Sequence, residues 1–370
     1  MCSDIIILAG GSGERLWPAS GPDKPKQFMK PSGEDSFLQS AILRASVLEI
    51  SGDICIITRK NWTNLVINEV QELAERIKKP ELISKIIIMS EPCGRNTAPA
   101  AAWASKYLLY KNNSIEPVNI LMMASDHLIS PLEVFARDVR TASWYAGQKN
   151  IVSFAIEPAA PETGYGYIKA GETLPLPFSG SSQAFVIDFF REKPDAATAQ
   201  SYLAEGNYYW NSGIYAFRAD FYLNELELYS PEIYQAFQDI DMYNSIETIA
   251  GIRIMSPNDS IEKAYKTTPP ISIDYAVSEK TERAVSVRAG FLWNDIGTWD
   301  SFAEYYSALS DTSASIKSEN CFVYSDIPVM LCGVSDIDVI IKNGKALVAK
   351  KGETNLVKEA LPLLDRKDKT

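Results

Sequence analysis

Short apolar runs alternate with longer stretches of helical spacing through the first 156 residues. The apolar runs predict buried strands over residues 5–9, 53–58, 85–89, 118–123 and 151–156. The stretches between them predict helices over residues 62–78, 98–110 and 132–148. Strands that alternate with helices are typical of a doubly wound α/β fold around a mostly parallel sheet, and we expect that fold here.

The pattern changes beyond residue 160. Residues 160–300 mix short apolar runs with aromatic-rich turns, which predicts insertions and an antiparallel extension of the sheet. Short β runs then follow at residues 321–324, 329–331, 339–341 and 346–348, with no helical pattern before about residue 354. The chain length allows more than one core. We therefore predict a large domain over residues 1–305 and a small β domain over residues 306–370.

The first predicted strand leads directly into three glycines and two cations. Gly10, Gly11 and Gly13 let the backbone approach a ligand closely and leave N–H groups free to point at phosphate oxygens. Arg15 and Lys26 add positive charge. This arrangement predicts a polyphosphate site, although an ordinary glycine-rich turn would explain the glycines alone about as well. The run contains no P-loop, and Leu16 stands where a dinucleotide-binding fingerprint needs its third glycine.

Charge and composition exclude several classes of function. A net charge of −11 argues against nucleic acid as a partner, but a local cationic pocket for a nucleotide remains compatible with it. The single histidine, His127, excludes zinc sites built on several histidines and disfavours a Ser-His-Asp hydrolase. Five cysteines without a C-x-x-C pair, together with no secretory signal, predict reduced thiols and a cytoplasmic protein. No apolar run approaches the roughly 20 residues that span a bilayer, so we expect no membrane contact.

A series of motifs in order along residues 10–299 resembles the signature of the sugar-nucleotide pyrophosphorylases, and in particular of the mannose-1-phosphate guanylyltransferases. The series is GGSGERLWP (10–18), PKQF (25–28), EPCGRNTAPA (91–100), SDH (125–127), PETGYGYI (161–168), EKP (192–194), WNSG (210–213), SIDYA (272–276) and WNDIGTW (293–299). A single motif of this kind is weak, but the complete series in order is highly specific.

The resemblance implies transfer of GMP from GTP to α-D-mannose 1-phosphate, which gives GDP-mannose and pyrophosphate with Mg²⁺ as cofactor. It also implies a Rossmann-like catalytic domain over residues 1–305 and a left-handed β-helix fragment over residues 306–370. Longer bifunctional relatives carry an added isomerase domain, and we expect the monofunctional form because 370 residues leave no room for one. Whether the chain forms a homodimer stays open.

The resemblance assigns roles to individual residues. The catalytic cations are Arg15, Lys26 and Lys193. The nucleotide-binding residues are Ala9, Gly10, Gly11, Ser12, Gly13, Arg15, Lys26, Arg95, Asn96, Thr97, Ser125 and Asp126. The sugar-binding residues are Glu157, Gly164, Glu192, Lys193 and Asn211, and the metal ligands are Asp126 and Asp295. His127 is expected to orient the loop that carries Asp126.

Spacing alone explains several of these residues more simply. Asp126 would serve as a turn or helix N-cap residue before Pro131, and Lys193 as part of a surface turn. The chain also departs from the family at Gly21, where arginine is usual, and at Ala124, where proline is common. A guanylyltransferase for another sugar 1-phosphate, such as a heptose, and a non-catalytic regulatory paralogue are the alternative functions.

Overall fold

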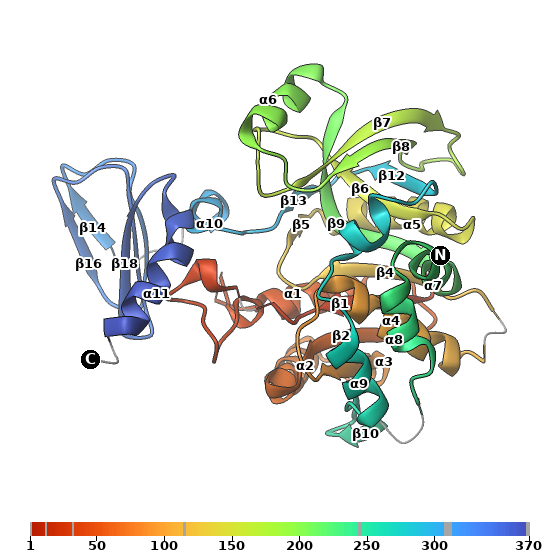
Figure 1. The fold of residues 1–370 in the computed structure, drawn as a ribbon. Coiled ribbons are helices and arrows are strands. Elements are labelled where there is room, and N and C mark those ends of the chain that lie inside the picture. The colour runs from red at the N-terminus through yellow and green to blue at the C-terminus, as the bar shows by residue number, and fades with distance from the viewer. Residues whose placement is uncertain are drawn as a thin grey trace. The chain divides into compact units, whose positions relative to one another are not determined.

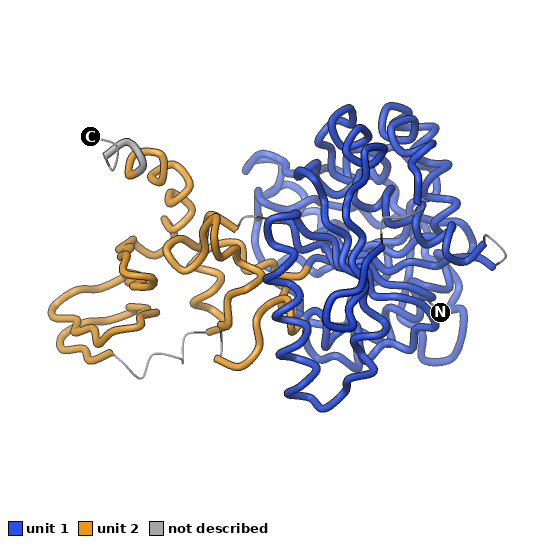
Figure 2. Tube along the Cα trace, turned by 90° about the horizontal axis from the view of Figure 1, so that it is seen from below, with its two compact units in different colours: residues 1–10, 41–124, 129–293 blue, residues 11–40, 125–128, 294–370 orange. Residues whose placement is uncertain are grey.

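The computed structural model describes residues 2–11, 13–31, 33–113, 116–242, 246–306 and 313–367, with side chains described as far as residue 364. These residues form two compact units (Figure 2). The first unit comprises residues 1–10, 41–124 and 129–293, and the second comprises residues 11–40, 125–128 and 294–370. The second unit therefore gathers three separate stretches of the chain. Whether residues 306–370 are a domain of their own stays a prediction.

The first unit is built on an eleven-stranded sheet (Figure 1). Its strands, in spatial order, are β10 (Ile246–Ile249), β11 (Ile252–Met255), β3 (Ile86–Glu91), β2 (Ile54–Arg59), β1 (Asp4–Leu8), β4 (Asn119–Ala124), β9 (Tyr208–Arg218), β6 (Ile151–Ile156), β12 (Ala284–Arg288), β8 (Ala184–Arg191) and β7 (Gly166–Leu174). The run from β11 to β4 is parallel throughout, with Ile5 paired to Ile54 and to Leu121. The expected antiparallel extension is formed by β7, β8 and β9.

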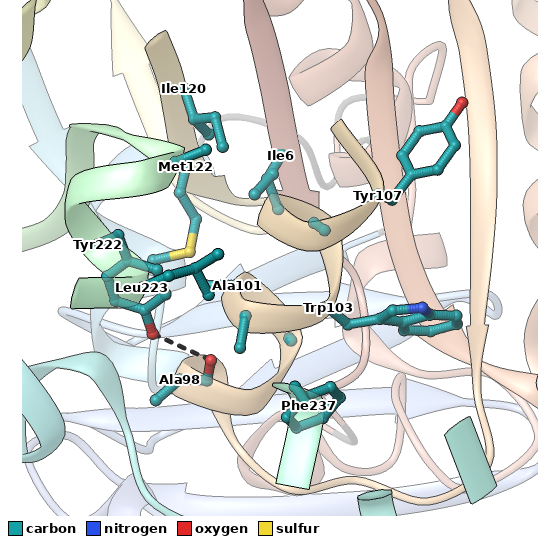
Figure 3. Packing of buried hydrophobic residues seen from close by; sticks show 14 of the residues in the cluster. Ile6, Ala98, Ala101, Trp103, Tyr107, Ile120, Met122, Tyr222, Leu223 and Phe237 are labelled. Atoms are coloured by element: carbon teal, nitrogen blue, oxygen red, sulfur yellow. Dashed lines mark hydrogen bonds between the residues drawn. The ribbon is translucent and has the colours of Figure 1, made fainter. Parts of the chain in front are cut away.

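Helices cover both faces of this sheet. They are α2 (Thr63–Ile77), α3 (Glu81–Lys85), α4 (Thr97–Lys111), α5 (Leu132–Gly147), α6 (Ala196–Glu205), α7 (Ala219–Tyr229), α8 (Pro231–Gln238) and α9 (Asp259–Thr267). Buried side chains of α4, α7 and α8 pack against Ile6, Cys55 and Met122 of the strands, and Figure 3 shows part of this core. There the Tyr222 hydroxyl donates a hydrogen bond of 3.0 Å to the carbonyl of Ala98.

The opposite face is covered by α5. Its Phe135 packs on Phe154 of β6, whereas Ile151 of the same strand belongs to the core under α4. Side chains three positions apart on a strand point to opposite faces, so α5 and α4 lie on opposite sides of the sheet. The doubly wound α/β fold predicted from the sequence is confirmed.

The second unit carries the short strands of the C-terminal region. These are β14 (Ser313–Ile316), β15 (Phe322–Ser325), β16 (Val329–Cys332), β17 (Ile337–Lys342) and β18 (Lys345–Lys350), followed by the 3₁₀ turn η5 (Thr354–Leu356) and helix α11 (Val357–Lys367). Ser313 pairs in parallel with Val329, and Phe322 with Asp338, so each partner lies 16 residues further along the chain. This stacking at a constant interval is that of a β-helix fragment, while the hand of the coil stays a prediction.

The remaining elements connect these parts. The 3₁₀ turns η1 (Glu14–Leu16) and η2 (Lys26–Phe28) and helix α10 (Trp299–Tyr306) belong to the second unit, and η3 (Lys60–Trp62) and the π-helical turn η4 (Asp274–Ser278) belong to the first. Helix α1 (Phe37–Ser46) and strands β5 (Leu128–Ser130) and β13 (Leu292–Asn294) contain three of the positions where the chain passes from one unit to the other.

Candidate active site

The glycine loop is built around close contact with Lys26. Gly13 has φ +64°, and a Cβ at this position would lie 2.3 Å from the Cβ of Lys26. The Ser20 hydroxyl donates to the Gly13 carbonyl at 2.5 Å, which fixes the end of the loop. Only glycine combines this backbone conformation with this approach. Ser12, one of the expected nucleotide-binding residues, lies outside the described residues.

Lys26 connects two segments that are distant in sequence. Its side chain is only 6% exposed, and its ammonium lies 2.8 Å from Oδ2 of Asp126 and 2.5 Å from the backbone oxygen of Asp295. A buried ammonium needs such partners to offset its desolvation. Burial alone would raise the pKa of Asp126, but the charges of Lys26 and then His127 lower it overall. The Asp126 carboxyl is therefore an anion at neutral pH.

Asp295 sits in a tight turn before helix α10. The Asn294 side chain accepts a hydrogen bond from the Ile296 N–H at 2.6 Å, and Asp295 Oδ1 accepts one from the Gly297 N–H at 3.1 Å. Ile296 adopts φ +46°, which is unusual for a β-branched residue, and its side chain is fully buried. A Cβ at Gly297 would lie 2.8 Å from Asp295 Oδ2 and 3.3 Å from a guanidinium nitrogen of Arg15. The turn therefore brings Asp295 near Arg15 within the second unit.

Two carboxylate residues in the segments around Lys26 have the chemistry of ligands to a divalent metal ion. Mg²⁺ is usually held by one or two carboxylates and completes its shell with phosphate oxygens and water. Asp126, whose side chain is 34% exposed, and Asp295 both belong to segments that contact Lys26. No group of three or more carboxylate, histidine or cysteine side chains among the described residues forms a metal cage, and a Mg²⁺–polyphosphate site does not require one.

The first unit contains the residues assigned to the sugar. Lys193 adopts φ +47° and pairs with Oε1 of Glu192 at 2.7 Å. Burial, and then the negative charge of Asp274, raise the pKa of Glu192. A Cβ at Gly166 would lie 2.5 Å from Oε2 of Glu192 and 3.5 Å from the Cβ of Asn211, so these two side chains flank the same glycine. The structure therefore brings Glu192, Lys193 and Asn211 together.

Two other expected sugar residues have fewer contacts. Glu157 follows β6 directly, its side chain is 70% exposed, and it pairs with Arg288 at 3.1 Å. Apart from its two chain neighbours, no described residue has an atom within 4 Å of the position that a Cβ on Gly164 would take. Their roles in sugar binding stay predictions.

The segment assigned to the base is anchored by its own hydrogen bonds. Arg95 donates to the backbone oxygen of Tyr265 at 2.7 Å, and Asn96 caps helix α4 through the N–H of Thr97. The Thr97 hydroxyl accepts from the N–H of Ile273 at 2.8 Å. These contacts explain the shape of the segment, and they leave its role in base recognition a prediction.

A buried carboxyl beside Gly10 was not among the expected site residues. Glu91 ends β3, is only 5% exposed, and accepts a hydrogen bond from the Tyr265 hydroxyl at 2.9 Å through Oε1. Its Oε2 lies 3.1 Å from the position that a Cβ on Gly10 would take. Burial raises the pKa of Glu91 to about 7. The sequence contained one signal for this residue, because Glu91 is the first residue of the motif at residues 91–100. A glutamate at the end of a strand is common, however, and does not by itself indicate a site.

The comparisons with known proteins decide the family. The model of the family described as "Nucleotidyl transferase" matches residues 4–312. The chain belongs to this family. Its members generally use a divalent metal ion, in agreement with the carboxylates near Lys26.

Curated relatives narrow the assignment and confirm the resemblance found in the motifs. The chain is 37% identical to a mannose-1-phosphate guanylyltransferase of Salmonella montevideo, over 98% of this chain and 73% of the relative. It is 34% identical to mannose-1-phosphate guanylyltransferase 2 of Escherichia coli O157:H7, over 99% of this chain and 74% of the relative.

A solved structure agrees with the fold. The crystal structure described as mannose-1-phosphate geranyltransferase from Thermus thermophilus matches with a TM-score of 0.77 and 27% identity, over 99% of this nucleotidyl transferase and 100% of that chain. Among the described residues, no helix has the length and apolar character needed to cross a membrane.

Proposed function

We propose that this nucleotidyl transferase moves GMP from GTP to α-D-mannose 1-phosphate, releasing pyrophosphate and GDP-mannose. The observation that carries the proposal is the buried Lys26 ammonium, which lies against the Asp126 carboxylate and the Asp295 backbone. The relatives named mannose-1-phosphate guanylyltransferase support the choice of substrates.

The chemistry needs charge neutralisation rather than a general base. The attacking phosphate has a second pKa of about 6, so at neutral pH it is mostly a dianion and is already nucleophilic. Its approach to the α-phosphorus of GTP is opposed by repulsion between like charges. Lys26 and Arg15 provide positive charge to the phosphates, which lowers this repulsion and stabilises the leaving pyrophosphate. A Mg²⁺ ion held by Asp126 and Asp295 would add to the same neutralisation.

In the proposal, the Glu192–Lys193 pair binds the sugar phosphate. The Lys193 side chain is 59% exposed, so its ammonium can meet a phosphate oxygen while it stays paired with Glu192. The Glu192 carboxylate and the Asn211 amide form hydrogen bonds with sugar hydroxyls. We assign phosphate binding to Lys193 because it is the cation next to these two groups.

We also propose that Glu91 reads the base. Guanine presents N1–H and N2–H₂ on one edge, and an ionised carboxylate accepts both, whereas adenine offers an acceptor at N1. The Tyr265 hydroxyl donates to Oε1, and Oε2 lies against the glycine loop, 3.1 Å from the position that a Cβ on Gly10 would take. This pairing supports GTP as the donor.

A panel of nucleotides and sugar phosphates tests the proposal. Purified protein is assayed with GTP, ATP and UTP, each with mannose, glucose and heptose 1-phosphates, and with Mg²⁺ or EDTA. We expect GTP and mannose 1-phosphate to give the highest kcat/KM, with some leakage to glucose 1-phosphate and no turnover in EDTA. Equal use of ATP and GTP would remove the guanylyl assignment, and preference for another sugar phosphate would replace mannose 1-phosphate as the proposed acceptor.

A cytoplasmic location, inferred from the cysteines, is part of the same proposal.

A further inference from the structure

The side chain of Asn211 is held in one orientation by two partners. Its Nδ2 donates to the Tyr215 hydroxyl and to Oδ1 of Asp274, both at 3.0 Å. Asn211 and Tyr215 of β9 pair with Ala155 and Ser153 of β6, which lie two positions apart and so mark the same face of the sheet. Tyr215 in turn donates its hydroxyl hydrogen to the same Asp274 oxygen at 2.5 Å. The three side chains form a closed triangle of hydrogen bonds.

The chemistry of these groups decides which end of the amide faces inward. An ionised carboxylate can only accept hydrogen bonds, so the atom of Asn211 that faces Asp274 must be the NH₂ group. The Asn211 oxygen therefore points away from the triangle. It is buried in a residue that is 6% exposed, and it has no hydrogen-bond partner among the described residues.

The position of Asp274 is fixed independently of Asn211. Asp274 begins the π-helical turn η4, a rare geometry that often marks functional positions. The residue before it, Ile273, donates its N–H to the Thr97 hydroxyl at 2.8 Å. Asp274 is therefore held by the backbone of its own turn and can impose an orientation on the amide.

The surroundings of the Asn211 oxygen indicate what would satisfy it. Its neighbours across Gly166 and along η4 are the carboxyl groups of Glu192 and Asp274, which accept, and the Lys193 ammonium, which donates. None of the acceptors can donate to the amide oxygen when ionised. A ligand with an anionic group for Lys193 and hydroxyl donors for the oxygens would complement this set.

We propose that Asp274 and Tyr215 are positioning residues that orient Asn211 so that its oxygen accepts a hydrogen bond from one hydroxyl of the sugar phosphate. This inference rests on the proposed function. It adds residues outside the expected site, and it sets the polarity of the contact: the sugar donates and the protein accepts.

Monodeoxy substrates test the inference. Wild type, Asn211→Ala, Asp274→Asn and Tyr215→Phe are assayed with mannose 1-phosphate and its 2-, 3-, 4- and 6-deoxy analogues, with Asp188→Asn as the matched control. Asp188 is an exposed carboxylate on β8. Thermal melts check that each variant folds. If Asp274→Asn does not fold, Tyr215→Phe still tests the inference.

We expect each triangle variant to lose at least about 10-fold in kcat/KM for mannose 1-phosphate, with KM for GTP unchanged, because one contact to the sugar is lost. The analogue that lacks the hydroxyl bound by Asn211 should have the same kcat/KM in the variants as in the wild type. This analogue should be the same one for all three variants. An equal loss with every analogue, or a loss in GTP binding, would overturn the inference. If the wild type uses another sugar 1-phosphate, the proposed substrate is wrong, and the deoxy series of that sugar decides the role of Asp274.

Discussion

Two buried charged side chains, Lys26 and Glu91, and the half-buried Asp126 carry most of the chemistry proposed for this enzyme. As whole residues Lys26 is 4% and Glu91 5% exposed, while the side chain of Asp126 is 34% exposed. Burial strengthens electrostatic interactions because fewer water molecules screen them. Each of these residues should therefore affect catalysis or specificity more strongly than an exposed residue of the same charge.

The exposed cation Lys193 should act on substrate binding. Lys193→Ala is expected to raise KM for the sugar phosphate at least about 10-fold with a smaller change in kcat, since it removes a contact present before the reaction. Arg15→Ala should mainly lower kcat, because charge develops on the leaving pyrophosphate. Lys169→Ala, which removes a half-buried lysine paired with Glu205, is the control. Steady-state kinetics that showed both variants changing GTP binding alone would contradict this division of roles.

Glu91 gives a prediction that depends on pH. Because burial raises the pKa of Glu91 to about 7, the carboxylate that accepts guanine N–H groups becomes more populated as pH rises through 7. The ratio of kcat/KM for GTP to that for ATP should therefore increase between pH 6 and pH 8. In Glu91→Gln the ratio should fall by roughly 10- to 100-fold and lose its pH dependence. A pH-dependent ratio of wild-type size in Glu91→Gln would exclude Glu91 as the reader of the base.

The sequence identified some of these residues and not others. Arg15, Lys26 and Asp295 were predicted from motifs, and they lie together in the second unit. Glu91 and Asp274 were missed as site residues, although both stand within quoted motifs. Their importance comes from burial and from partners such as Tyr265, which lies 174 residues from Glu91 in sequence, and residue patterns do not report such partners.

Among the elements, two backbone features hold the phosphate site. The glycine loop brings Gly13 against Lys26, and the turn after β13 holds Ile296 at φ +46° while its side chain is buried in the core of the second unit. A β-branched residue in this conformation costs roughly 1–3 kcal/mol, which burial of its side chain offsets. Strain of this kind persists where surrounding packing fixes the chain.

The glycine loop predicts that alanine substitutions at Gly13 and at Gly21 differ in their effect on stability. Gly13→Ala should lower the free energy of unfolding by at least about 1–2 kcal/mol and reduce kcat, because its Cβ would overlap Lys26 and its φ is positive. Gly21→Ala should be close to neutral in stability, since apart from its chain neighbours no described residue lies within 4 Å of its Cβ position. Denaturant unfolding of both variants checks this, and equal stabilities would show that the loop tolerates a side chain at residue 13.

Elements with strong periodicity were predicted well, and those set by tertiary contacts were not. The predicted strand at residues 151–156 is observed at Ile151–Ile156, and the predicted helix at residues 132–148 at Leu132–Gly147. The parallel pairing of β11 with β3 and the π-helical turn η4 were not predicted. Both depend on packing against residues far along the chain, which a local pattern does not contain.

For the molecule as a whole, stability should depend on Asp338. This residue on β17 is fully buried, neither carboxyl oxygen has a partner among the described residues, and burial followed by the charge of Asp300 raises its pKa to about 6. Because the folded-state pKa is above that of the unfolded chain, the stability linked to its proton is present at pH 4 and is lost as pH rises through 6.

Asp338→Asn should therefore gain stability relative to wild type as pH rises. The difference in free energy of unfolding between the variant and wild type should grow by on the order of 1–3 kcal/mol from pH 4 to pH 8. Denaturant unfolding of both proteins across this pH range measures the difference. Any effect of the amide on stability that does not depend on pH leaves the change with pH unaltered. A difference that does not change with pH would contradict the assignment of a raised pKa.

The central claim is that the residues around Lys26 bind metal and phosphate for GMP transfer, and one measurement tests it most directly. GDP-mannose formation from GTP and mannose 1-phosphate is followed at saturating Mg²⁺ for wild type, Asp126→Asn and Asp295→Asn, with thermal melts to confirm folding. We expect each substitution to lower kcat by at least roughly 10²-fold, because each removes a charged metal ligand. Folded variants that keep near wild-type rates would contradict the claim.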